Sequence, residues 1–234
     1  MSTRPPTPPA VDGLADLADS FHPGGLRRAE QFSCYSHLVG ALGAVVGTAA
    51  LALSARDTAR VLLALIYGSS MVLMFTASAL YHAFKEGEDS QSLWRRLDHV
   101  AIFFMIAGSY TPICWVHLEG AWRWSMVGIQ WGLVLVGLAF KLLFIGAPRW
   151  VTAAIYVVMG WMVVIPMHRL LASWDATETA LLVGGGVTYT LGAVIYASKR
   201  PNPWPGLFGF HEIFHVAVVL GAGLHYAAIF RMIA

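Results

Sequence analysis

Residues 61–84 of the chain read VLLALIYGSSMVLMFTASALYHAF and form an uncharged stretch between Arg60 and Lys85. As a helix rising 1.5 Å per residue, this stretch is long enough to cross the roughly 30 Å hydrocarbon core of a bilayer. Its apolar residues occur on all sides and lack the alternation of a strand. Because lipid offers no partners to backbone N–H and C=O groups, only helices and closed barrels span it. The stretch therefore predicts a transmembrane helix.

Six further uncharged stretches are of the same kind, so seven membrane spans are expected. Charged residues make up only 12% of the 234-residue chain, whereas soluble domains carry about 25%. The predicted fold is an all-α membrane protein, a seven-transmembrane helix bundle of residues 32–234, preceded by a disordered or surface-lying tail of residues 1–31. The expected spans cover approximately residues 33–54, 61–84, 98–117, 123–142, 150–170, 178–198 and 209–231.

The distribution of lysine and arginine predicts the orientation of the bundle, because cytoplasmic loops carry the excess of these residues. Ten of them lie on the side of the N-terminal tail and five on the other side. This predicts a multi-pass protein of the plasma (inner) membrane, with the N-terminus in the cytoplasm and the C-terminus outside. The ten are Arg4, Arg27, Arg28, Lys85, Arg95, Arg96, Lys141, Arg149, Lys199 and Arg200; the five are Arg56, Arg60, Arg123, Arg169 and Arg231.

The sequence argues against nucleic-acid binding and against a scaffold held by disulfides. The net charge is only +2 and the sequence has no basic stripe, so nucleic acid is not an expected partner. Cys34 and Cys114 both fall inside predicted spans and give no disulfide framework.

Polar side chains converge at one end of the predicted bundle. The second span ends in Ser78 and His82, the third begins at Asp98, and the seventh opens with His211 and His215. Since successive spans alternate in direction, these three span ends lie at one membrane level, here the cytoplasmic one. Ionisable groups inside a membrane are costly and mark functional sites. The topology alone therefore brings three histidines and an aspartate to one depth.

The histidines suit a zinc site. His211 and His215 are four residues apart, so their imidazoles lie on the same helix face. His82, from a second helix, completes a set of three nitrogen ligands with a fourth position open, which is the arrangement of catalytic zinc. His225 lies about 15 Å further along its helix than His215, too far to share the metal.

Asp98 and Ser78 are the candidate catalytic residues beside this site. Asp98 could hold the water on the metal or orient a ligand, and Ser78 could hydrogen-bond that water or a substrate oxygen. Two alternatives stay open. Asp98 could pair with Arg95 or Arg96 at the interface, and Ser78 could only pack against a neighbouring helix.

Other polar residues close to the predicted site have less certain roles. Residues 211–215 spell H-E-x-x-H, a signature in which the glutamate is a general base, but a helix turns Glu212 about 100° away from His211. We expect Glu212 to face a polar loop or a neighbouring helix instead. Glu30 and His37 are seven residues apart on about the same helix face. For His37 a structural hydrogen bond is expected rather than a role as a fourth contributor to the site.

Several segments together resemble the hemolysin III group within the progestin and adipoQ receptor family. They cover nearly everything after residue 30. One departure is that Ser33 and Ser36-His37 stand where the family often has Asn and Thr-His. The matching segments are Glu30–Gly43 (EQFSCYSHLVGALG), Ser78–His82 (SALYH), Arg95–Pro112 (RRLDHVAIFFMIAGSYTP), Gly160-Trp161, 184–200 (GGGVTYTLGAVIYASKR) and 208–226 (FGFHEIFHVAVVLGAGLHY).

This resemblance implies a seven-helix bundle with a cytoplasmic N-terminus and a zinc site near the inner leaflet. It implies His82, His211 and His215 as ligands, with Asp98 holding a water and Ser78 nearby. The adiponectin-receptor branch is associated with ceramide hydrolysis, and the wider superfamily of such bundles is proposed to consist of metal-dependent hydrolases. The bacterial branch takes its name from haemolytic activity.

Four functions follow as hypotheses, of which an intramembrane zinc protease is the weakest. The leading one is a zinc-dependent hydrolase of lipid amides or esters, ceramidase-like, whose partners are membrane lipids such as ceramide or another acyl substrate. The second is a non-enzymatic receptor or membrane-homeostasis regulator in which zinc is structural. The third is a haemolysin-type membrane-lytic protein, which an apolar and fully packed bundle disfavours.

Overall fold

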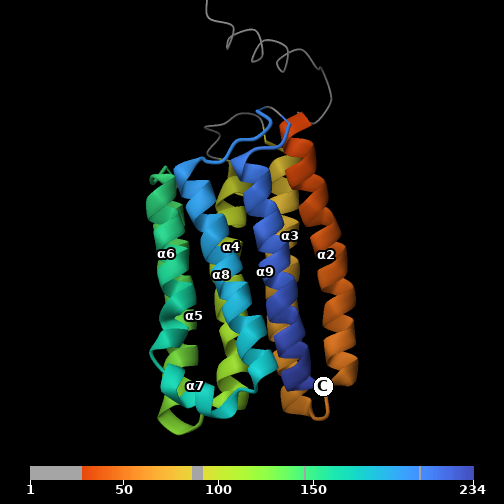
Figure 1. The fold of residues 1–234 in the computed structure, drawn as a ribbon, viewed down its shortest axis with the longest axis vertical. Helices are drawn as coiled ribbons and strands as arrows, with labels where there is room; N and C mark the ends of the chain where they lie inside the picture. The colour runs from red at the N-terminus through yellow and green to blue at the C-terminus, as the bar shows by residue number, and fades with distance from the viewer. Residues whose placement is uncertain (1–27, 86–91, 145, 206) are drawn as a thin grey trace, which may run out of the picture.

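The computed structural model describes residues 28–85, 92–144, 146–205 and 207–234 (Figure 1). Within these ranges the chain forms long antiparallel helices that lie side by side, and no β-strand is formed. The helices are α2 (Arg28–Ser54), α3 (Thr58–Ala83), α4 (Leu93–His117), α5 (Gly120–Leu143), α6 (Arg149–Trp161), α7 (Met167–Ser173), α8 (Ala176–Ser198) and α9 (Phe210–Ile233), with the short 3-10 helix η1 (Met162–Val164).

The number of spans agrees with the predicted bundle. Among the described residues, six helices are each long and apolar enough to cross a membrane, and a seventh crossing is formed if one bent pair counts as a single span. That pair consists of Arg149–Val164 and Met167–Ser173, which meet at an angle of 60°. The all-α membrane fold is therefore confirmed.

The span expected over residues 150–170 corresponds to this bent pair of helices. The span is interrupted around Pro166, where α6 and η1 give way to the short helix α7. Proline has no backbone N–H to donate, and its ring clashes with the preceding helical turn. Hydropathy detects the apolar stretch but not this change of direction.

The first helix also begins earlier than expected. Helix α2 starts at Arg28 rather than near residue 33, and Glu30 already belongs to its membrane-spanning segment. The tail expected over residues 1–31 is thus shorter, and its remainder, residues 1–27, lies outside the described residues.

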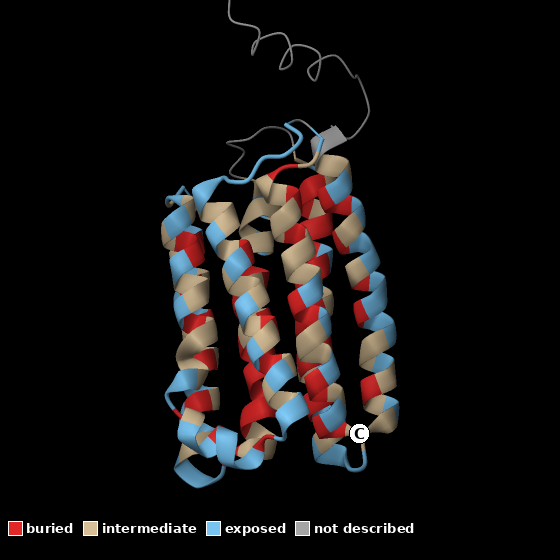
Figure 2. Cartoon of the chain, viewed as in Figure 1, coloured by how far each residue is buried: buried red, intermediate tan, exposed pale blue. Residues whose placement is uncertain are grey.

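The outer faces of the bundle are apolar and the inner faces are buried. Figure 2 shows buried residues turned toward neighbouring helices and exposed ones on the periphery. Large apolar side chains remain exposed there, including Leu53 at 87% and Val46 at 70%. Exposed apolar surface of this extent is unfavourable in water, whereas in a bilayer it faces acyl chains. The exposure pattern therefore fits a lipid solvent.

Helix α4 contains a proline, and the neighbouring hydroxyl groups bond to its backbone. Pro112 lies inside the helix. Ser109 donates to the Met105 carbonyl and Thr111 donates to the Ala107 carbonyl, each at 2.8 Å. These bonds satisfy buried hydroxyls where lipid could not.

Tyr110, between those two residues, joins α4 to the interrupted span. Its hydroxyl donates to the Gly160 carbonyl at 2.6 Å and accepts from the Val163 N–H at 2.6 Å. Both partners lie where α6 passes into η1, so one phenol satisfies two backbone groups that the helix break leaves without regular partners.

We predict that Tyr110→Phe destabilises the protein by about 1–3 kcal/mol, because it leaves the Val163 N–H and the Gly160 carbonyl without this partner in a partly buried site. Thermal unfolding in neutral detergent micelles measures the effect. The matched control is Tyr35→Phe, since Tyr35 is 56% exposed on the periphery. Equal unfolding temperatures for the two variants would show that the hydrogen bonds of the Tyr110 hydroxyl do not stabilise the interruption between α6 and α7.

Candidate metal centre

Three histidines from two helices meet at the end of the bundle where α2 begins, called here the histidine end. His82 lies in the last turn of α3, and His211 and His215 lie in the first turns of α9. The Nε2 atom of His211 is 3.3 Å from that of His82 and 3.2 Å from that of His215. All three potential ligand atoms lie within 4.8 Å of one another. The predicted convergence of these side chains is confirmed.

The spacing of these nitrogens fits a tetrahedral metal ion. Zinc binds histidine at about 2.0–2.1 Å, which places two ligand nitrogens about 3.3 Å apart in a tetrahedron. Two of the separations match this value. The cluster could thus hold a metal with little movement of the side chains.

Hydrogen bonding alone cannot satisfy this cluster. A neutral imidazole has one N–H donor and one acceptor nitrogen. The Nε2 atom of His211 lies next to two other Nε2 atoms. Because it carries either one proton or one lone pair, it forms a regular hydrogen bond with only one of them. His82 and His215 are each only 1% exposed, so water cannot compensate freely. A cation that accepts three lone pairs would resolve this conflict.

Glu30 determines which nitrogen of His82 faces the cluster. Its carboxylate lies 2.5 Å from His82 Nδ1, and its second oxygen accepts from Lys85 Nζ at 2.5 Å. The Nδ1–H therefore donates to Glu30, and the Nε2 lone pair is left toward the other histidines. Histidine ligands of metals characteristically donate their other N–H to such a carboxylate.

This role for Glu30 was not predicted from the sequence. Helix α2 packs against α3 in the fold, and this neighbour relation brings position 30 to His82. The available signal was a lone acidic residue at the edge of a long apolar stretch, on the face that also carries His37.

Both ring nitrogens of His37 are buried, and among the described residues only the backbone of His215 interacts with them as a hydrogen-bond partner, short of regular hydrogen-bond geometry. The ring lies against His215, with ring centroids 4.0 Å apart, and packs edge-on against Phe75. The ring of His37 thus packs against one side of the histidine cluster.

Asp98 and Ser78 lie in the same cavity as the histidines but outside the group of potential ligands. The two side chains are close enough to hydrogen-bond to each other, and the charge of Asp98 acts on His82. Arg96, one alternative partner of Asp98, instead donates to the Leu142 carbonyl at 2.6 Å. The charge of Arg95 also acts on Asp98, so the alternative pairing with Arg95 stays open, and the roles of Asp98 and Ser78 stay predictions.

Two other polar residues are engaged elsewhere. Glu212 accepts from the Gly209 N–H at 2.7 Å and so caps the start of α9. This agrees with rejecting the glutamate of H-E-x-x-H as a general base. His225 lies within hydrogen-bond distance of the Leu182 carbonyl, 3.1 Å from its Nε2, away from the cluster.

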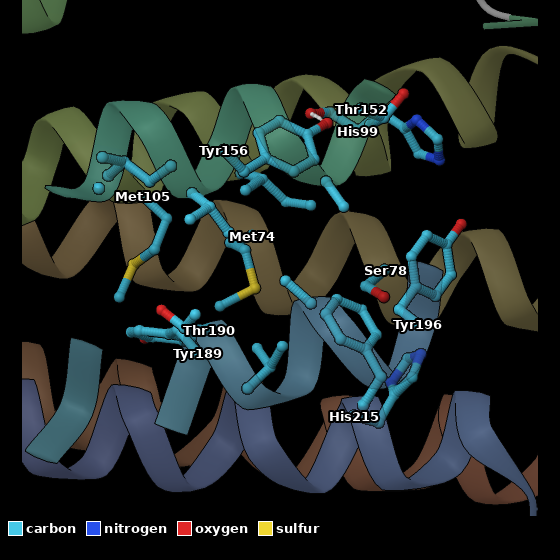
Figure 3. Close-up of a pocket in the computed structure, with 18 of the residues that line it drawn as sticks. Met74, Ser78, His99, Met105, Thr152, Tyr156, Tyr189, Thr190, Tyr196 and His215 are labelled. Carbon is cyan, nitrogen blue, oxygen red and sulfur yellow. Dashed lines mark hydrogen bonds between the residues drawn. The ribbon is translucent and has the colours of Figure 1, made fainter. Parts of the chain in front are cut away.

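A cavity of about 800 Å³ begins at the histidine end and continues through the bundle toward Trp174. In Figure 3, His215 and Ser78 lie near one end, and Met74 and Met105 line the wall further along. The cavity thus joins a polar cluster to an apolar interior, which suits an amphiphilic molecule.

Comparison with known proteins agrees with this architecture. The sequence pattern of the family described as "Haemolysin-III related" matches residues 27–226. The chain is 31% identical to "Hemolysin-3" of Bacillus cereus, over 68% of this chain and 69% of that protein. It is 32% identical to the "Hemolysin-3 homolog" of Bacillus subtilis (strain 168), over 67% and 70%.

A human relative extends the comparison. The chain is 27% identical to "Monocyte to macrophage differentiation factor" of Homo sapiens, over 85% of this chain and 82% of that protein. The family match covers α2 to α8 in full and α9 as far as Tyr226, and it includes Glu30 and all three clustered histidines. The chain therefore belongs to the hemolysin III family, within the progestin and adipoQ receptor family of membrane proteins.

Proposed function

We propose that the protein is a zinc-dependent hydrolase of lipid amides or esters. The observation that supports this most directly is the triad of His82, His211 and His215, whose nitrogen spacing fits tetrahedral zinc and which opens on an amphiphile-sized cavity. When bound there, zinc would supply a Lewis acid for a carbonyl and a water that is acidic near neutral pH.

The side chains around the triad provide the other parts of such a reaction. Glu30 holds His82 in one tautomer through Nδ1. We assign proton acceptance to a side-chain oxygen of Asp98, and Ser78, whose hydroxyl donates to Asp98, would still accept a hydrogen bond from water. The apolar part of the cavity excludes water and accommodates acyl chains.

Zinc could also have a purely structural role. A metal held by the three histidines would join α3 and α9, and the contact of His82 with Glu30 would link α2 to them. In that case the protein is a receptor or regulator, and no reaction depends on Asp98. The metal and activity measurements below separate these two functions.

The first prediction concerns metal content. The purified wild-type protein is expected to carry equimolar zinc, and His82→Ala, His211→Ala and His215→Ala are each expected to lose it, because two nitrogens do not make a tight zinc site. Elemental analysis after dialysis measures this. The control is His168→Ala, an exposed histidine at the opposite end of the bundle. Zinc retained in all three cluster variants would contradict the assignment.

The second prediction concerns turnover. Purified protein is expected to hydrolyse ceramide-like lipids, and a chelator that removes zinc is expected to abolish this activity. Asp98→Asn should keep the zinc but lower kcat by about 10²–10⁴-fold, the usual contribution of a general acid or base. If no lipid amide or ester is cleaved while His211→Ala strongly lowers the unfolding temperature, the structural role of zinc is favoured instead.

The third prediction concerns Glu30. Glu30→Gln is expected to weaken zinc affinity about 10–100-fold, because the neutral amide no longer supports His82 as a ligand. Competition with a chromogenic chelator measures the affinity, and Glu119→Gln, an exposed carboxylate, is the control. Unchanged affinity would mean that the contact between Glu30 and His82 does not support metal binding.

A further inference from the structure

His37 has no part in the proposed reaction, yet it is a histidine buried in α2 with an exposed fraction of only 3%. The backbone of His215 is the group of the described residues that interacts with its ring nitrogens as a hydrogen-bond partner. One such group can engage only one of the two nitrogens. Because a buried polar atom without a partner costs free energy, packing alone would favour an apolar ring at this position.

The ring of His37 is fixed between two other helices. Its centroid lies 4.0 Å from that of His215 on α9, whereas the other two rings of the triad lie 4.7 and 4.8 Å from His215. Phe75 of α3 packs edge-on against His37, with centroids 5.1 Å apart. Gly40, three residues further along α2, leaves room for Phe75, because a Cβ atom there would lie 2.7 Å from that ring. His37 is therefore the nearest ring to His215.

His215 needs a hydrogen-bond acceptor if it binds a metal. Its Nε2 lies 3.2 Å from that of His211, within the triad. Its Nδ1 is buried without a partner among the described residues. A neutral histidine that binds a metal through Nε2 carries its proton on Nδ1, and such ligands characteristically donate this proton to a carboxylate, a carbonyl or water. Glu30 is this acceptor for His82, but His215 has no carboxylate within 4 Å in the described part of the chain.

A nitrogen lone pair of His37 can meet this need. Among the described rings that pack on His215, two belong to the triad itself, and Phe214 has no acceptor. His37 is the remaining one, and it has two ring nitrogens. The torsion that turns a histidine ring about its Cβ–Cγ bond is soft, so a small rotation can aim one of these nitrogens at Nδ1 of His215.

We propose that His37 is a positioning residue for the metal: one of its ring nitrogens accepts a hydrogen bond from the Nδ1–H of His215 and thereby keeps Nε2 of that ligand directed at the metal. Helix α2 then supplies no ligand but holds two of them, with Glu30 on His82 and His37 on His215. The proposal rests on the metal of the proposed function and does not depend on hydrolysis.

Zinc affinity of the purified full chain, measured by competition with a chromogenic chelator, tests the proposal. His37→Phe keeps a ring for packing but removes both nitrogens, so it is expected to weaken zinc binding about 10–100-fold. The matched control is His117→Phe. The side chain of His117 is only 8% exposed, but it lies at the opposite end of the bundle and outside the cavity lining, so this variant should bind zinc as the wild type does.

His37→Ala separates the hydrogen bond from ring packing. It removes the nitrogens and the ring, and its zinc affinity is expected to fall at least as far as that of His37→Phe. If His37→Phe binds zinc as tightly as the wild type, the proposal is overturned, and weaker binding by His37→Ala alone would show that His37 acts only through packing.

The Nδ1–H of His215 gives a second measurement that packing alone would not change. In the zinc-loaded wild type with ¹⁵N-labelled histidine, NMR should show this proton downfield and slow to exchange with water. In His37→Phe it should move upfield and exchange faster, while the Nδ1–H of His82, held by Glu30, stays in place. A rapidly exchanging His215 Nδ1–H in the wild type would overturn the proposal even if the variants failed to fold.

The same measurements separate this proposal from the proposed function. A wild-type protein that binds no zinc would overturn both. Zinc binding that depends on the nitrogens of His37, without cleavage of any lipid, would overturn the hydrolase and support the role of His37.

Discussion

The hydrogen bond between Glu30 and His82 is the constraint on which the histidine end depends. It places a carboxylate from α2 against an imidazole from α3, and the Lys85 ammonium compensates the negative charge that would otherwise be buried near lipid. With Nδ1 committed to Glu30, His82 must direct Nε2 toward His211, and His211 in turn faces His215. The orientation of the whole cluster thus follows from one contact between neighbouring helices.

The same requirement, that polar groups in lipid find partners within the protein, explains the rest of the interior. Tyr110 satisfies the backbone at the break in the fifth crossing, and the hydroxyls of Ser109 and Thr111 bond to carbonyls of their own helix. Against this background, the buried polar groups without partners stand out. His37, His99 and Trp174 each have at least one such atom and all line the cavity, where a ligand or water can reach them.

Charged groups of both signs lie close to the histidine cluster. Glu30 contacts His82, and the charges of Asp98 and His82 act on each other. Arg149 has its guanidinium group over the ring of Phe210, the residue before His211, and its charge acts on that histidine. Such charges interact more strongly in a protein interior than in water, because the effective dielectric constant is lower there.

The sequence by itself determined the membrane solvent, the approximate spans and the meeting of His82, His211 and His215, because length, hydropathy and alternating direction set the depth of each residue. It did not determine which helices touch. The partner of His82 at Glu30, the contact between the rings of His37 and His215, and the burial of Lys141 depend on how helices rotate and pack about their axes. The bend at Pro166 likewise depends on the support that Tyr110 gives from another helix. Hydropathy fixes position along the membrane normal, and packing decides position within its plane.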